Sequence, residues 1–168
     1  TGARLHVFHL STGKETNLFS NELPLKDKKI TAEVCIHHLW FTDKDYDKKG
    51  TMIKWNPAVK SSQDRDALWE ALLNDKIDVI ATDHAPHAAH AKELPFDQAP
   101  PGMLGLETAF SLALGESGLD LPEVLALLSW KPAAIAGVAD RHGAPVVPGV
   151  PANLCVVDPD ETWTVSGA

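Results

Sequence analysis

The sequence predicts an α/β fold with a parallel sheet, for three reasons. A strand followed by a helix is predicted three times within the first 85 residues, which is the order that crossover connections between parallel strands require. The β-branched run 77–82 has the character of a short strand buried in such a sheet. Asp83 ends that run, and α/β barrels carry their reactive groups at the C-terminal ends of their strands. A complete barrel takes about 250 residues, so the 168 residues here are expected to form only part of one.

The first strand is expected over residues 4–9. Strict alternation places His9 on one face and His6 on the opposite face, toward the helices. Thr12 and Glu15 have the spacing of a capping box, which predicts a helix directly afterwards. His9 is therefore expected where a strand passes into a helix.

The second strand is expected over residues 30–36 and ends at the pair His37 and His38, which we assign to structural support rather than to metal binding. A charged surface loop without chemistry of its own is expected over 43–50. The segment 54–60 has no clear period and is expected to be a structured loop, in which Pro57 favours an extended conformation for the preceding Asn56.

The third unit begins with a helix capped by Ser61 or Ser62, followed by the strand that ends at Asp83. The apolar face expected for this helix consists of Ala67, Leu68, Ala71 and Leu72. His84 and His87 follow Asp83 closely. If the strand continued, His84 would point away from Asp83, so a structural role is expected for it.

Three more helices are expected beyond the histidine-containing loop, over 105–118, 122–128 and 131–138. From Gly143 to Pro151, proline and glycine residues become frequent. The runs 153–157 and 163–165 are expected to be short strands, too few to form a sheet by themselves. We therefore divide the chain into a first part, 1–142, and a second part, 143–168.

Composition narrows the classes of function. The formal net charge of −8 gives no basic footprint for nucleic acid or for an anionic membrane. Neither a membrane-spanning run nor a secretory leader is recognisable, and the chain begins at Thr1, as a piece of a longer protein would. Cys35 and Cys155 lie in apolar runs and are expected to be buried free thiols, which suits a cytoplasmic location.

The polar residues at the predicted strand ends suggest a metal site. A carboxylate that faces a barrel interior is costly unless it is paired or metal-bound. Imidazole and carboxylate groups are typical zinc ligands, so Asp83, followed by the His84-x-x-His87 spacing, favours such a site more than the lone His9 does.

Five motifs together resemble the dihydroorotases of the amidohydrolase superfamily, in order and in approximate spacing over essentially the whole chain. They are residues 8–12 (FHLST), 32–34 (AEV) with 37–39 (HHL), 54–57 (KWNP), 81–87 (ATDHAPH) and 101–108 (PGMLGLET). The resemblance implies the C-terminal part of a (β/α)8 TIM-type barrel, namely its last three strands and helices. It also implies a short β tail that belongs to the family's small β-sandwich domain.

The resemblance also implies roles for individual residues. His9 matches a ligand of one metal of a binuclear zinc centre, and Asp83 matches the ligand of the other metal and the catalytic proton carrier. The residues that match substrate-binding groups are Asn56, His87, Pro101 and Gly102. The implied reaction is the zinc-dependent, reversible cyclisation of N-carbamoyl-L-aspartate to dihydroorotate in pyrimidine biosynthesis.

Part of the ligand set implied by the resemblance is absent from the chain: a His-x-His pair on the first barrel strand, a bridging carboxylated Lys or Asp, and a further His. Catalytic zinc sites generally use three protein ligands, so we expect this chain alone to be inactive. Two alternatives stay open. One is an allantoinase-like or dihydropyrimidinase-like enzyme. The other is a non-catalytic dihydroorotase-like partner of aspartate transcarbamoylase. The expected partners are a small-molecule substrate and either a second copy of the chain or aspartate transcarbamoylase.

Overall fold

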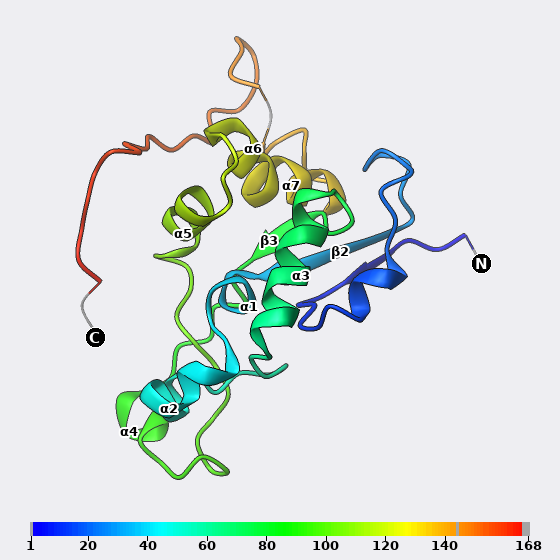
Figure 1. The fold of residues 1–168 in the computed structure, drawn as a ribbon. Coiled ribbons are helices and arrows are strands. Elements are labelled where there is room, and N and C mark those ends of the chain that lie inside the picture. The colour runs from blue at the N-terminus through cyan, green and yellow to red at the C-terminus, as the bar shows by residue number, and fades with distance from the viewer. Residues whose placement is uncertain (1, 144, 166–168) are drawn as a thin grey trace.

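A three-stranded parallel sheet lies at the centre of the computed structural model, which describes residues 2–143 and 145–165 (Figure 1). Its strands are β1 (Leu5–Val7), β2 (Ile30–Cys35) and β3 (Val79–Ala81), in the spatial order β1-β2-β3. Both pairings are parallel, as the sequence predicted. The C-terminal ends of all three strands therefore lie at the same edge of the sheet.

Helices cover one face of this sheet. The α-helices are α1 (Ile36–Trp40), α2 (Tyr46–Lys49), α3 (Ser62–Leu73), α4 (Ala89–Lys92), α5 (Ala109–Glu116), α6 (Leu121–Leu125) and α7 (Lys131–Ile135). The core joins sheet residues such as Val34 and Ile80 to Leu68 of α3, Ala113 of α5 and Val124 of α6. Burial of this apolar surface holds α3, α5 and α6 against the sheet, whereas α2 and α4 lie away from it (Figure 1). None of the helices in the described part of the chain is long and apolar enough to cross a membrane.

The helix predicted after Ser61 or Ser62 forms as α3. Ser61 caps α3 by accepting a hydrogen bond from the Asp64 amide, and the predicted apolar face of α3 is largely buried. The segments predicted at 122–128 and 131–138 join into one helical stretch, in which the π-helical segment η4 (Ala126–Trp130) connects α6 to α7. Only part of the helix predicted at 105–118 forms, namely α5 (Ala109–Glu116).

One local prediction is wrong, and a second holds only in part. Residues 43–50 were expected to form a loop, but they contain the 3-10 helix η2 (Asp43–Asp45) and α2, and η3 (Gly50–Ile53) follows directly. Thr42 and Asp45 form a reciprocal capping box that satisfies backbone donors at the start of this stretch. The helix expected after Thr12 is a single 3-10 turn, η1 (Glu15–Leu18), although Glu15 does accept hydrogen bonds from the backbone amides of Ser11 and Thr12.

The prediction for the faces of the first strand is also wrong. Val7, not His6, points to the helices and packs against the core. His6 lies on the opposite face, with Nδ1 2.8 Å from Thr31 Oγ1 and Nε2 3.0 Å from Glu33 Oε2. With Val7 on the core side, alternation places His6 on this face, where both of its nitrogens have polar partners on the neighbouring strand.

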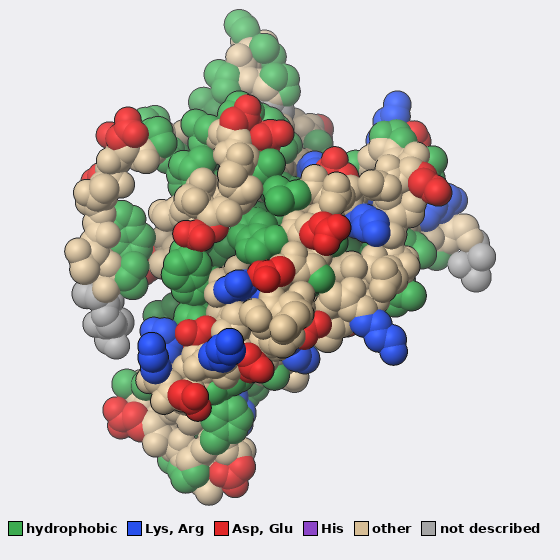
Figure 2. Space-filling view, viewed as in Figure 1, with side chains coloured by type: hydrophobic (Ala, Val, Ile, Leu, Met, Phe, Trp, Pro, Cys, Tyr) green, Lys and Arg blue, Asp and Glu red, His purple; other side chains and the backbone are tan. Residues whose placement is uncertain are grey.

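The strands predicted in the tail do not form. Residues 145–165 leave the helical body as an extended segment without a strand partner (Figure 1), and open space separates part of it from the helices (Figure 2). Strands require a partner for their backbone groups, and this segment pairs with no strand among the described residues. As a consequence Cys155 is exposed rather than buried, whereas Cys35 is a buried free thiol as predicted.

A buried ion pair connects β2 to β3 at the N-terminal end of the sheet. Lys28 Nζ lies 2.7 Å from Asp78 Oδ1, and the side chains are 7% and 4% exposed. The second oxygen of Asp78 accepts a hydrogen bond from the backbone amide of Ala32 at 3.0 Å, and Lys28 also donates to the backbone oxygen of Asp75. This network fixes where β3 begins relative to β2.

Replacing Asp78 by Asn should therefore destabilise the fold strongly, because it leaves the Lys28 ammonium buried without a counter-charge. Removal of one partner of a buried pair costs about 3–5 kcal/mol, measurable as the free energy of unfolding in urea. The control is Lys131→Met, which removes a 2.7 Å pair with the exposed Asp75 and should cost less than about 1 kcal/mol. Equal effects of the two substitutions would contradict this account.

Candidate active site

The two residues predicted to bind metal both lie just beyond the ends of strands, in the same unusual backbone conformation. His9 follows β1 with φ of 39°, and Asp83 follows β3 with φ of 43°. Among the described non-glycine residues, only Asp75 shares a positive φ. Such conformations are energetically unfavourable for residues with a Cβ and concentrate at functional sites. They also explain why strand alternation does not determine the direction of the His9 side chain.

The buried thiol of Cys35 lies within electrostatic reach of Asp83. Burial raises the pKa of the Cys35 thiol far above its ordinary value, and the negative charges of Asp83 and Glu33 raise it further. Cys35 therefore stays protonated at neutral pH and is a poor nucleophile or metal ligand. Asp83 itself is exposed at the strand edge, free of ion pairs among the described residues.

The donors in this chain fit part of a metal site. One imidazole beyond β1 and one carboxylate beyond β3, on either side of β2 at the same end of the sheet, are the ligand types that zinc and similar ions accept. Within residues 2–143 and 145–165, however, no cluster of three or more His, Cys, Asp or Glu side chains could hold a metal ion. His9 and Asp83 would supply two of the donors, and a catalytic site needs at least one more.

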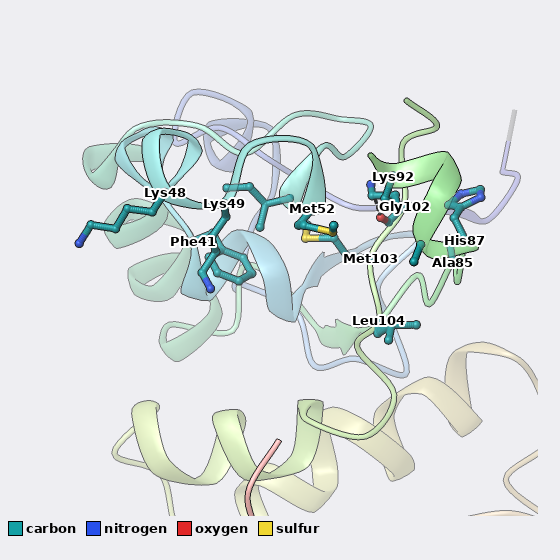
Figure 3. A pocket seen from close by; sticks show the side chains of 12 residues that line it. Phe41, Lys48, Lys49, Met52, Ala85, His87, Lys92, Gly102, Met103 and Leu104 are labelled. Atoms are coloured by element: carbon teal, nitrogen blue, oxygen red, sulfur yellow. Dashed lines mark hydrogen bonds between the residues drawn. The ribbon is translucent and has the colours of Figure 1, made fainter. Parts of the chain in front are cut away.

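The structure brings three of the four predicted substrate-binding residues together. The His87 ring donates from Nε2 to the backbone oxygen of Pro101 at 3.0 Å. Gly102 lies directly against this contact: a Cβ at position 102 would lie 2.6 Å from both the Ala85 oxygen and His87 Cδ2. With φ of 156°, position 102 requires glycine for conformation and for space. Figure 3 shows His87, Ala85 and Gly102 side by side.

Asn56, the fourth predicted residue, is not in direct contact with this group. It is exposed in the loop after η3, and the Gly102 amide connects the two regions by donating to the Lys54 oxygen at 2.9 Å. A backbone hydrogen bond therefore holds the segment that carries Asn56 beside the segment that carries Gly102.

Lys92 was not anticipated from the sequence, although it holds this region together. Its ammonium is buried and donates to the backbone oxygens of Gly102 at 2.9 Å, Pro100 at 3.1 Å and Lys54 at 3.4 Å. Burial lowers the pKa of Lys92, and the nearby positive charge of Lys54 adds to the effect. A lone lysine in a segment that the sequence predicts to be a loop carries no pattern that distinguishes it from a solvated charge, so only the fold reveals this role.

A cavity of about 510 Å³ opens beside these loops (Figure 3). Phe41, Met52 and Met103 give it an apolar wall, and His87, Lys92 and Gly102 also line it. His9 and Asp83 are not part of its lining. The cavity therefore adjoins the predicted substrate loop but does not include the strand-end donors.

The pair His37 and His38 lies buried in α1, which agrees with the structural role assigned from the sequence. His38 donates from Nε2 to the Pro57 oxygen at 2.9 Å, and the His37 ring meets Trp55 edge-on, with 4.6 Å between ring centroids. His37 Nε2, His38 Nδ1 and Trp55 Nε1 are buried and have no hydrogen-bond partner. Burial lowers the pKa of His37 to about 4, with smaller contributions from His38 and His84.

The chain belongs to the amidohydrolase family, whose sequence profile matches residues 5–167. Members of this family are generally metal-dependent. The predicted resemblance to dihydroorotases is confirmed by curated relatives. The chain is 42% identical over 172 residues to the dihydroorotase of Mycobacterium leprae and 42% identical over 173 residues to that of Mycobacterium tuberculosis. Each alignment covers 99% of this chain but only 39% of the relative.

Solved structures share the fold. An L-hydantoinase (dihydropyrimidinase) from Arthrobacter aurescens superposes with a TM-score of 0.78 at 29% identity, over 90% of this chain and 35% of that protein. A dihydroorotase from Saccharomyces cerevisiae, in complex with 5-fluoroorotic acid, superposes with a TM-score of 0.71 at 19% identity, over 82% of this chain and 39% of that protein. The amidohydrolase-type α/β fold is therefore established for this chain.

Replacing Gly102 by Ala should displace residues 101–102 from His87, because the new Cβ would overlap the Ala85 oxygen and the His87 ring. The expected cost is more than about 1 kcal/mol in the free energy of unfolding, together with a changed NMR environment of the His87 ring. The matched control is Gly115→Ala in α5, where a Cβ meets nothing within 4 Å and should stabilise the helix by up to about 1 kcal/mol. A Gly102→Ala variant as stable as the control would refute the close packing.

The pH dependence of stability should report the burial of His37. Its pKa is lower in the folded chain, about 4 against an ordinary 6.5, so the unfolded chain takes up the proton first as the pH falls. Stability should therefore decline from pH 6.5 to pH 4, by on the order of 3 kcal/mol from this residue. Urea unfolding at several pH values should show a shallower decline in His37→Gln. The exposed His142→Gln is the control, and a slope unchanged by His37→Gln would contradict the account.

Proposed function

We propose that the protein carrying this chain is a dihydroorotase, which interconverts N-carbamoyl-L-aspartate and dihydroorotate. The observation that carries the proposal is the position of His9 and Asp83. These two residues, matched to metal ligands by their motifs, have the positive φ values expected of strained functional residues and lie at the same edge of the sheet. The 42% identity to curated dihydroorotases supports the same reaction.

The proposed architecture is part of a (β/α)8 barrel, with β1, β2 and β3 as its last three strands. A chain that spans about two fifths of its relatives is too short for a whole barrel, and β1 and β3 lie at open edges of the described sheet. We assign residues 1–142 to the barrel and residues 143–168 to the small β-domain. The remaining metal ligands would lie in barrel strands outside this chain.

The metal we propose is zinc, in a binuclear site to which His9 and Asp83 contribute one donor each. A bound zinc ion lowers the pKa of water to about 7 and so makes hydroxide available at neutral pH. The role of Asp83 is to accept the proton of the attacking water and to return it to the departing ring nitrogen. During hydrolysis the oxygen adds to the ring carbonyl carbon, the bond from that carbon to the ring nitrogen breaks, and the nitrogen leaves protonated.

The substrate-binding roles rest on the loop that contains His87, Pro101 and Gly102. Dihydroorotate is an anion with a ring of amide groups, and it requires hydrogen-bond donors and acceptors at fixed positions. The His87 ring and the backbone groups near Gly102 are held together and would contact the carboxylate and the ring. Asn56, on the adjoining loop, would complete this contact.

A chimera tests the function directly. Residues 1–168 replace the matching segment of the Mycobacterium tuberculosis dihydroorotase, to which they are 42% identical, so that the missing barrel strands are supplied. We expect the chimera to form dihydroorotate and Asp83→Asn to lower its kcat at least 100-fold, since general acid–base catalysis contributes about 10²–10⁴-fold. The 168 residues alone should show no turnover.

The control variant is Asp66→Asn, an exposed carboxylate on α3 whose loss should leave kcat unchanged. The alternative of a dihydropyrimidinase-like enzyme is tested with 5,6-dihydrouracil, the same ring without the carboxylate. A chimera that prefers dihydrouracil to dihydroorotate, or that retains full activity with Asn at position 83, would refute the proposal.

A further inference from the structure

The left-handed conformation of Asp83 needs support from outside the sheet. β3 ends at Ala81, so neither Thr82 nor Asp83 is held by strand pairing. Asp83 is exposed and has φ of 43°. A residue with a Cβ keeps such a conformation only when its surroundings enforce it.

The next residue supplies a fixed contact. The Nδ1 atom of His84 accepts hydrogen bonds from two backbone amides, Gly105 at 3.1 Å and Leu106 at 3.2 Å. A backbone N–H only donates, so Nδ1 must present its lone pair and the ring hydrogen must be on Nε2. With two donors at one lone pair, Nδ1 is not available to bind a metal ion.

The segment that His84 contacts is itself rigidly placed. The backbone oxygen of Met103 accepts a hydrogen bond at 3.0 Å from the amide of Ala85, the residue that follows His84. Gly105 is packed so closely that a Cβ would lie 2.8 Å from His37 Nε2 and 3.3 Å from the Thr82 oxygen. The Gly105 oxygen also accepts from the amide of Ala109, the first residue of α5 and part of the buried core. The contact therefore connects the end of β3 to α5.

We propose that His84 is the positioning residue for Asp83: by accepting hydrogen bonds from the Gly105 and Leu106 amides, it anchors the strand end to α5 and fixes the left-handed backbone from which the Asp83 carboxylate projects. The importance of this position for catalysis rests on the proposed function. The anchoring itself does not, and the two are measured separately.

Two amide substitutions test the anchor. In His84→Asn the side-chain oxygen occupies the place of Nδ1, whereas in His84→Gln it reaches one bond further, to the place of Nε2. Hydrogen exchange of the Gly105 and Leu106 amides, measured by NMR in the full 168-residue chain, should accelerate about tenfold or more in His84→Gln. Exchange in His84→Asn should stay within about threefold of the original chain. The exposed His90→Gln serves as the control.

The conformation of Asp83 is the second measurement. Its backbone carbon chemical shifts should indicate a positive φ in the original chain and in His84→Asn, but not in His84→Gln. Equal amide exchange in the two variants, or an unchanged Asp83 in His84→Gln, would overturn the proposal. If neither variant folds, nitrogen NMR of the unsubstituted His84 ring decides: an unprotonated Nδ1 with protected Gly105 and Leu106 amides supports the anchor, and a protonated Nδ1 overturns it.

Catalysis is tested in the chimera described above. His84→Gln should lower kcat at least tenfold with KM changed less than about threefold, because the substrate loop is intact, and His84→Asn should restore kcat. A chimera without any activity refutes the proposed function but leaves the exchange result to decide the anchor. Retained kcat in His84→Gln would refute the positioning role even if the exchange rates behave as expected.

Discussion

The buried pair of Lys28 and Asp78 is the interaction on which the arrangement of the strand ends depends. It lies at the N-terminal end of the sheet, where Asp78 also accepts the Ala32 amide and so sets the register of β3 against β2. Given that register, Cys35 lies beside Ala81, and the chain beyond β3 emerges next to α1. A charged pair at one end of the sheet thus determines which groups meet at the opposite end.

At that opposite end the candidate site has two parts that are built differently. His9 and Asp83 depend on strand ends and left-handed backbone, while His87, Pro101 and Gly102 depend on a loop that the buried Lys92 ammonium holds through backbone oxygens. The contacts from His84 to the segment 105–106 connect these two parts. Strand ends place donor groups accurately, and loops fixed by several hydrogen bonds supply binding contacts on that scaffold.

The sequence predicted those features that depend on strong local patterns. The parallel strands and the α3 helix with its Ser61 cap follow from the strand-then-helix order and the capping residues. The resemblance grouped His87, Pro101 and Gly102 as substrate-binding residues, and the structure brings them into contact, while their role stays a prediction. Features that depend on partners distant in sequence were missed. The face of His6 is set by Thr31 and Glu33 on the neighbouring strand. The tail around Cys155 had a strand pattern but no partner to pair with among the described residues.

The central claim is that His9 and Asp83 form one side of a metal site. Anomalous X-ray diffraction at the zinc edge, on crystals of the chimera grown with zinc, tests it most directly. We expect a zinc ion bound to a ring nitrogen of His9 or to a carboxylate oxygen of Asp83 at about 2.0–2.2 Å, with a second zinc on the other residue. Zinc bound elsewhere, with both residues free of metal, would contradict it.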